Sequence, residues 1–188
     1  MKSRLFLLIG FVVVTLLTLS TLAMTGFNLP QSQGQPAGNL VQTVRQAADQ
    51  YKDVAAAEAA GYGLFLGCVS GPQEGAMGVH YPNGALVGDG VLDPMQPEVL
   101  VYEPTSNGLK LVAVEYLVLA DDWNANNASP PVLMGQVFHY SGSPNRYGLP
   151  AFYELHVWAW KNNPNGVFAD WNPLVTCEGY NPAVSSNQ

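Results

Sequence analysis

One segment limits the fold more than any other: the long run LKLVAVEYLVLA at residues 109–120. Side chains of a β-strand alternate between its two faces. The even positions are apolar from Val112 onward, and the odd positions are apolar except for Glu115. A strand that is apolar on both faces must be covered on both faces. We therefore predict a central strand over residues 109–119.

The rest of the chain predicts an α+β fold with long loops. Residues 39–60 have apolar side chains at three- and four-residue steps, with Asn39 to cap a helix and Gly61 to end it. Asn-Gly in the turn before residue 109 predicts a hairpin, because these residues adopt positive φ readily. We expect one amphipathic helix packed on a mostly antiparallel sheet that can curl toward a barrel. The predicted strands are 63–69, 77–81, 98–103, 109–119, 136–140 and 151–160.

The N-terminal residues have the pattern of an export signal. Lys2 and Arg4 precede an apolar run from Leu5 to Leu19. Thr21 and Ala23 then provide the small side chains that a signal peptidase site requires.

This pattern divides the chain into three parts. We predict a signal peptide over residues 1–23, a flexible spacer over 24–38 and a single domain over 39–188. The alternative is an uncleaved anchor, since residues 5–26 are long enough to cross a bilayer. Both alternatives place the domain outside the cytoplasm, secreted or periplasmic, and a membrane contact would involve only the N-terminal segment.

Composition argues against nucleic acid as a partner. The chain has 7 basic and 14 acidic residues, a net charge of −7, and charged residues make up only 11% of it. A surface so poor in Lys and Arg cannot neutralise many phosphates. The apolar fraction of 48% also argues against a disordered body.

Cys68 and Cys177 are the only cysteines of the chain. An exported protein meets an oxidising environment, which favours a disulfide between them. The alternative is a nucleophilic thiol activated by a histidine, which requires a reduced cysteine.

The most informative polar residue is Glu115, because packing alone does not place a carboxylate on an apolar strand face. Its burial is costly unless a cation, a metal or hydrogen bonds compensate. His80 and His156 lie in other predicted strands, and Gly78 beside His80 leaves room for a close neighbour or ligand. Two imidazoles and one carboxylate are the donors of open mononuclear metal sites. We therefore predict a site for one transition-metal ion, zinc, copper or iron, formed by His80, Glu115 and His156.

Further candidates surround this set. Glu154 and Glu103 are candidates to orient a ligand imidazole, and the third histidine, His139, is a weaker candidate for the same environment. Aromatic side chains are candidates to line a cleft for an apolar small molecule, although such residues commonly form plain core. These are Phe152, Trp158, Trp160 and Trp171.

Several ordered motifs resemble those of an uncharacterised family of small exported proteins, mostly bacterial. They are YKDVAAAEAAGY (51–62), MGVHYPN (77–83), PEVLVYEP (97–104), LVAVEY (111–116), LHVWAWKNNPNG (155–166) and FADWNP (168–173). The resemblance covers residues 45–180 and carries His80, Glu115 and His156 inside its motifs, whereas His139 lies outside them. The family has no established activity, so the resemblance implies no reaction.

Three functions are compatible with these patterns. The first is an extracytoplasmic metal-binding protein, and a metal-dependent enzyme if it turns over a substrate. The second is a non-catalytic module that binds a small molecule in an aromatic cleft. The third is a structural envelope protein, in which Glu115 and the histidines satisfy one another or the backbone.

Overall fold

The computed structural model describes residues 35–181. Six strands form one antiparallel sheet in the order β1-β2-β3-β4-β8-β7, and β5 and β6 form a separate two-stranded ribbon. The strands are β1 (Phe65–Ser70), β2 (Ala76–Pro82), β3 (Val99–Thr105), β4 (Gly108–Leu119), β5 (Val132–Leu133), β6 (Gln136–Val137), β7 (His139–Ser141) and β8 (Phe152–Val157). The helices are α1 (Gln35–Ala48), the 3-10 helix η1 (Asp49–Lys52), α2 (Val54–Ala59), α3 (Gly84–Val87) and α4 (Ala120–Asn124).

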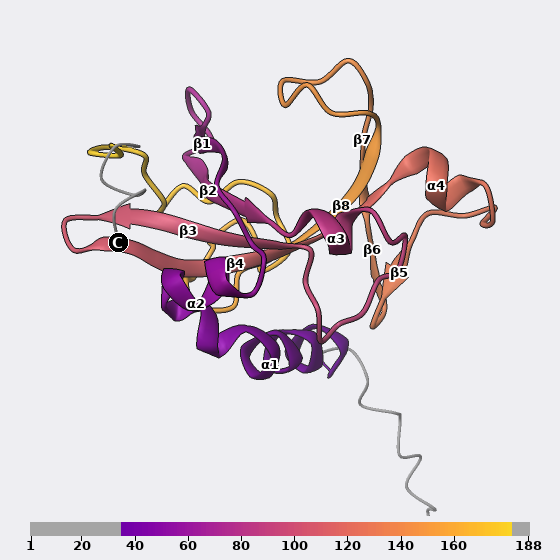
Figure 1. Cartoon of the computed structure of the whole chain (residues 1–188), viewed down its shortest axis with the longest axis horizontal. Coiled ribbons are helices and arrows are strands. Elements are labelled where there is room, and N and C mark those ends of the chain that lie inside the picture. The colour runs from indigo at the N-terminus through magenta and orange to yellow at the C-terminus, as the bar shows by residue number, and fades with distance from the viewer. Residues whose placement is uncertain (1–34, 182–188) are drawn as a thin grey trace, which may run out of the picture. The chain divides into compact units, whose positions relative to one another are not determined.

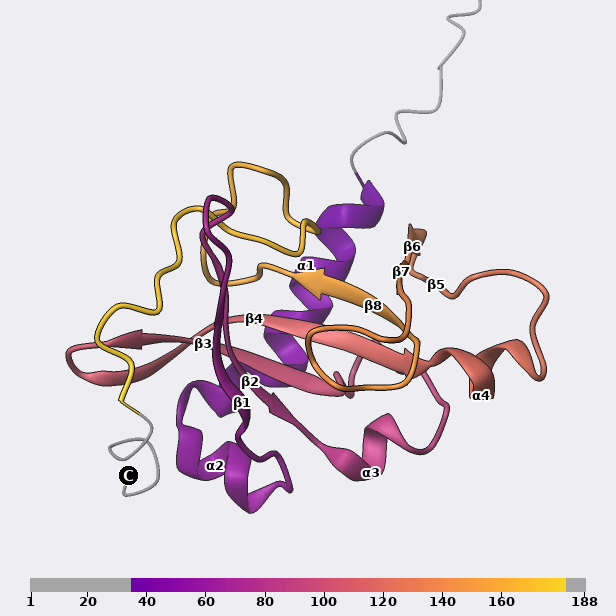
Figure 2. The same ribbon diagram turned by 90° about the horizontal axis from the view of Figure 1, so that it is seen from above.

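This architecture confirms the predicted α+β class and the mostly antiparallel sheet. The sheet curls strongly, but β1 and β7 remain edge strands within residues 35–181, so it is not a closed barrel. Helices α1 and α2 lie on one side of β3 and β4, and the segment that follows β8, as far as residue 181, lies mainly on the other side (Figure 1). Seen from above, α1 crosses beneath β4 and β8 (Figure 2).

The predicted helix over residues 39–60 is interrupted. It begins earlier, at Gln35 within the predicted spacer, and Asn39 lies inside α1 rather than at its cap. It breaks at Asp53, whose side chain accepts a hydrogen bond from the amide of Ala55 and so starts α2. Gly61 ends α2 as predicted, with φ +93°, because glycine adopts the left-handed conformation without steric cost.

Strand β4 is central, as predicted, because it pairs with both β3 and β8. One detail of the prediction is wrong. Val101 pairs with Ala113 but Tyr102 pairs with Leu111, so Val112 forms a bulge that reverses the alternation. Leu109 and Leu111 therefore pack on the opposite face from Glu115, although all three occupy odd positions.

The two faces of the sheet have different covers. We call one the helix face: Leu40 and Val44 of α1 pack there with Leu100, Tyr116 and Leu155 of the sheet. We call the other the loop face, where segments between and after the strands cover the sheet. Its core residues include Val99, Val101, Leu117, Phe152, Trp158 and Val175.

Two other predicted strands differ more clearly from the structure. The predicted strand 136–140 divides at Phe138, whose buried ring separates β6 from β7. The predicted strand 151–160 ends at Val157. The signal peptide and most of the spacer lie outside the described residues. Among the helices of residues 35–181, none is long and apolar enough to cross a membrane.

Candidate metal centre

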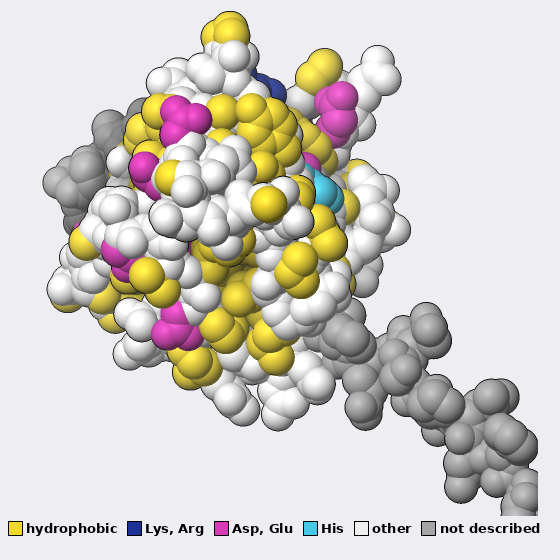
Figure 3. Space-filling model, turned by 90° about the vertical axis from the view of Figure 1, so that its right-hand side faces the viewer, with side chains coloured by type: hydrophobic (Ala, Val, Ile, Leu, Met, Phe, Trp, Pro, Cys, Tyr) yellow, Lys and Arg dark blue, Asp and Glu magenta, His cyan; other side chains and the backbone are white. Residues whose placement is uncertain are grey.

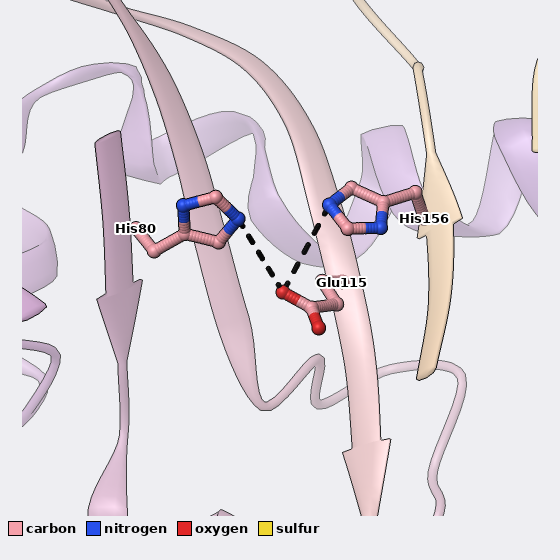
Figure 4. Close-up of side chains that lie close together, drawn as sticks. All are labelled: His80, Glu115 and His156. Carbon is pink, nitrogen blue, oxygen red and sulfur yellow. Dashed lines mark ion pairs between the residues drawn. The ribbon is translucent and has the colours of Figure 1, made fainter. Parts of the chain in front are cut away.

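Three strands bring the predicted ligands together on the loop face. His80 lies on β2, Glu115 on β4 and His156 on β8. Glu115 and His156 are direct cross-strand partners, so their side chains leave the sheet side by side. His80 reaches the same point from across β3, where its register partner is Val101. Figure 4 shows both imidazoles directed at the Glu115 carboxylate.

The distances between these side chains suit metal coordination better than hydrogen bonding. Oε2 of Glu115 lies 3.6 Å from Nε2 of His80 and 3.9 Å from Nε2 of His156. Both separations are too long for a hydrogen bond. Ligand atoms that are each about 2.0–2.2 Å from one tetrahedral zinc ion lie roughly 3.3–3.6 Å apart. The three donors therefore need only small movements to share one ion.

His80 has the orientation and tautomer that a metal ligand needs. Its Nδ1 lies 3.2 Å from the carbonyl oxygen of Gly78, to which it can donate its proton. This leaves the lone pair on Nε2, the nitrogen that faces Glu115. The predicted space beside Gly78 is taken by β3: a Cβ there would lie 2.5 Å from the carbonyl oxygen of Tyr102, and φ is +110°. Glycine thus lets β2 approach β3 closely.

His156 is the least satisfied polar side chain at this place. It is 0% exposed, and neither ring nitrogen has a hydrogen-bond partner. Its Nε2 faces Glu115, while its Nδ1 lies 3.6 Å from Oδ1 of Asp170 and 3.9 Å from Oε2 of Glu154. Buried polar groups in folded proteins nearly always have partners, so two orphaned nitrogens on one ring require an explanation.

Burial and mutual charge shift the pKa values of all three residues. Burial lowers the pKa of His80 to about 3, and His156 adds to the effect, so His80 is neutral at physiological pH. Burial raises the pKa of Glu115 to about 8, although His156 opposes the shift. Burial alone would lower the pKa of His156, but Glu115, Asp170 and Glu154 raise it to about 9. The Glu115–His156 pair therefore keeps a proton at neutral pH.

Asp170 is a site residue that the sequence analysis missed. Its carboxylate lies between Nδ1 of His156, at 3.6 Å, and Nδ1 of His139, at 3.0 Å. The hydrogen bond from Trp158 Nε1 to the carbonyl of Ala169 holds this segment over β8. The motif FADWNP contains Asp170, and an acidic residue within an aromatic segment is the signal that could have indicated it.

The other predicted polar residues occupy different places. Oε2 of Glu154 lies 3.9 Å from Nδ1 of His156, and its Oε1 accepts a hydrogen bond from the Ser141 hydroxyl. His139 is half-exposed and contacts the site through Asp170. Glu103 contacts a lysine instead of a ligand imidazole. Both of its carboxylate oxygens accept hydrogen bonds from Nζ of Lys161, at 2.6 and 2.8 Å.

The four aromatic candidates do not form one cleft. Phe152 lines a cavity beside the site. Trp158 stacks on His156, with ring centroids 6.3 Å apart and planes inclined by 20°. Trp160 lies beyond the end of β8 and packs against the core of the helix face. Its Nε1 lies 3.4 Å from Oδ1 of Asp49. Trp171 lies under the guanidinium of Arg146.

Cys68 and Cys177 form a disulfide across a sequence separation of 109 residues. The alternative of a nucleophilic thiol is therefore wrong, because the structure contains no free cysteine. The bridge ties β1, which borders the site, to the C-terminal segment. It is consistent with an oxidising, extracytoplasmic environment.

No family model, curated protein or solved structure matches this chain. The resemblance of its motifs to exported proteins therefore stays a prediction. The fold and the site define the chain as an α+β protein with a buried His/Glu/His group that can hold a metal ion. Its function has to be argued from that group.

Proposed function

We propose that this protein binds a single transition-metal ion through His80, Glu115 and His156. The observation that carries the proposal is His156, which is completely buried with both ring nitrogens lacking a hydrogen-bond partner. A metal ion on Nε2 would use one lone pair, and a proton on Nδ1 would interact with Asp170 and Glu154. Carboxylates commonly hold the second nitrogen of ligand histidines in this way.

The donor set limits the metal and its chemistry. Two imidazoles and one carboxylate suit zinc, copper or iron, and they leave coordination positions for water or a ligand. When bound, such an ion can polarise a ligand or activate water. In this scheme Glu115 supplies the anionic ligand, and the cover of the loop face limits access of bulk water. If the protein is an enzyme, this proposal implies that its catalysis depends on the bound metal ion.

We also propose that the protein acts outside the cytoplasm. The disulfide and the signal-like residues 1–23 support this location. The net charge of −7 argues against a nucleic-acid partner, and acidic side chains outnumber basic ones on the face in Figure 3. Contact with a membrane would depend on the N-terminal segment alone.

Metal analysis of protein purified without a histidine tag tests the proposal. We expect about one equivalent of metal in the wild type after reconstitution with zinc, and loss of that metal in Glu115→Gln. Glu98→Gln is the matched control, because Glu98 is a buried glutamate that precedes β3 and lies outside the site. Failure of the wild type to retain Zn²⁺, Cu²⁺ or Fe²⁺ would contradict the proposal, as would equal metal content in both variants.

Metal binding should also depend on pH. Because the pKa values of both Glu115 and His156 are raised, a bound proton must leave before both residues can act as ligands. We therefore expect zinc affinity to rise as the pH increases from about 6 to about 9. Calorimetry in buffers with different ionisation enthalpies measures the released protons. Zinc binding without proton release would show that the ion binds elsewhere.

One observation favours a second candidate function. A cavity that Phe152 lines adjoins His80 and Glu115, which is the arrangement expected of a non-catalytic module for small molecules. Co-purification of an apolar small molecule with metal-free protein would favour this function over the first.

A further inference from the structure

The loop face contains a cavity of about 200 Å³ directly beside the metal centre. Its floor is formed by side chains of the sheet, among them Val99, Leu117 and Phe152. Its rim includes side chains from outside the central strands, such as Leu66 and Leu149. Leu66 is 53% exposed, so the apolar lining continues to the protein surface.

The lining is apolar except at one place. Its only ionisable side chains apart from Tyr147 are His80, Glu115 and Glu154, which lie together at the metal centre. The hydroxyl of Tyr147 donates a hydrogen bond to the sulfur of Met77, at 3.3 Å, so that polar group is also occupied. The cavity therefore has an apolar body and a single polar end.

The volume limits the size of a ligand. An apolar cavity of about 150 Å³ is large enough to bind benzene. A cavity of about 200 Å³ therefore suits one ring with a short substituent. It has no Lys or Arg in its lining to bind phosphate or several carboxylates. Nucleotides, sugars and phosphorylated ligands are thus poor matches in both size and polarity.

The charge at the polar end limits the group that a ligand presents. A divalent ion held by two neutral imidazoles and one carboxylate has a charge of about +1 together with these ligands, and the Glu154 carboxyl group lies beside it in the same lining. The ion can therefore take one neutral or singly anionic oxygen or sulfur ligand. Additional charges on the ligand would remain unpaired among apolar side chains, which is costly.

We propose that this cavity binds small aromatic or alicyclic molecules that carry one metal-coordinating oxygen or sulfur group. The ring packs on Leu117 and Phe152, and the coordinating group binds the ion held by His80, Glu115 and His156. The proposal rests on the proposed metal site and specifies its class of ligand.

Three probes separate the two parts of this proposal. Toluene with metal-free protein tests the apolar body alone. Acetohydroxamate with zinc-loaded protein tests the coordinating group alone, and benzohydroxamate tests both together. Because burial of a phenyl ring contributes substantially to affinity, we expect benzohydroxamate to bind zinc-loaded protein at least about tenfold more tightly than acetohydroxamate. We also expect toluene to bind metal-free protein, detected by NMR shifts of residues on the loop face.

Two variants test whether the ring occupies this cavity. Leu117→Trp fills its floor, and Leu149→Trp fills its rim from a half-buried loop position where folding is less sensitive. Zinc content is measured on the same samples. We expect Leu149→Trp to keep zinc and acetohydroxamate affinity, and both variants to lose toluene binding and the tenfold advantage of benzohydroxamate.

The outcomes distinguish this proposal from the metal site itself. Equal affinity of zinc-loaded protein for the two hydroxamates, or an advantage that survives in Leu149→Trp, overturns the ligand class while the metal site stands. Absence of zinc binding overturns the proposed function, and the metal-anchored ligand with it, even if toluene binds.

Discussion

The helix face and the loop face of the same sheet treat buried polar groups differently. On the helix face the hydroxyl groups of Tyr62, Tyr102 and Tyr116 each donate a hydrogen bond of 2.7 Å to a backbone carbonyl, whereas that of Tyr180, which packs against the same core, has no partner. On the loop face both nitrogens of the buried His156 lack a hydrogen-bond partner. Most polar groups of the helix face are thus satisfied, because an unmade buried hydrogen bond costs free energy.

Two buried glutamates show the same contrast. Glu98 precedes β3 beside Leu100, and its carboxylate accepts a hydrogen bond from the amide of Leu117 at 3.1 Å. Glu115 instead faces two imidazoles at distances too long for hydrogen bonds. The difference supports our proposal that the loop face binds a metal ion, whereas the helix face is organised for packing.

Truncation of one leucine on each face gives the largest expected effect. Leu100 is fully buried on the helix face, so Leu100→Ala should create a cavity and lower the free energy of unfolding by about 2–5 kcal/mol. Leu117 already borders a cavity on the loop face, so Leu117→Ala should cost less. Urea denaturation of metal-free protein measures both values.

The same pair of variants should separate in ligand binding. Leu117→Ala should change toluene affinity, whereas Leu100→Ala should leave it near the wild-type value at temperatures where the variant is folded. Equal losses of stability, or a larger ligand effect from Leu100→Ala, would show that the two faces do not differ as we describe.

The contrast also explains how much could be predicted from the sequence. Apolar residues on both faces of the predicted strand identified β4 as a central strand, and Glu115 was conspicuous as the one charged residue on an otherwise apolar face. The bulge at Val112 was not predictable, because a bulge depends on the register between strands and not on the pattern of one strand.

The composition of the site was more predictable than its geometry. His80 and His156 could be selected because they lie in predicted strands of a chain with few basic residues. The two histidines converge because β8 pairs with β4 and because only β3 separates β2 from β4. Both arrangements depend on contacts between residues far apart in the sequence. Asp170 comes from a loop without periodicity, so its position follows from tertiary contacts alone.

Asp170 gives the next largest expected effect and tests how the loop face supports its buried histidine. Burial alone would raise the pKa of Asp170, but its contacts with His156 and His139 hold it below the usual value. Asp170→Asn removes the charge that supports the His156 imidazole. We expect zinc affinity to fall about 10–100-fold, as is common when a carboxylate partner of a ligand histidine is lost.

A second readout distinguishes this role from a merely structural one. Without Asp170, the pKa of His156 should fall, because one of the carboxylates that raise it is gone. The pH dependence of zinc binding should therefore move to lower pH. Asp122→Asn, in an exposed carboxylate of α4, is the control. An unchanged pH dependence in Asp170→Asn would assign Asp170 to the loop structure alone.

The last expected effect concerns Glu98, on the helix face. Burial raises the pKa of Glu98 to about 8, whereas the unfolded chain should titrate near its ordinary value of 4.5. The native state therefore binds more protons than the unfolded state between these pH values, and stability falls as the pH rises through them. Gln has no such proton to lose, and its side-chain oxygen can still accept the hydrogen bond from Leu117.

We therefore expect the stability of Glu98→Gln relative to the wild type to increase by up to about 3 kcal/mol as the pH rises from about 5 to about 8, in metal-free protein. Glu115 is present in both proteins, so its own titration largely cancels in the difference. Urea denaturation across this pH range measures the effect, with exposed Glu74→Gln as the control. A difference independent of pH would mean that Glu98 ionises as readily as an exposed glutamate. The Glu98 carboxylate would then be stable as a buried anion. In that respect the helix face would not differ from the loop face.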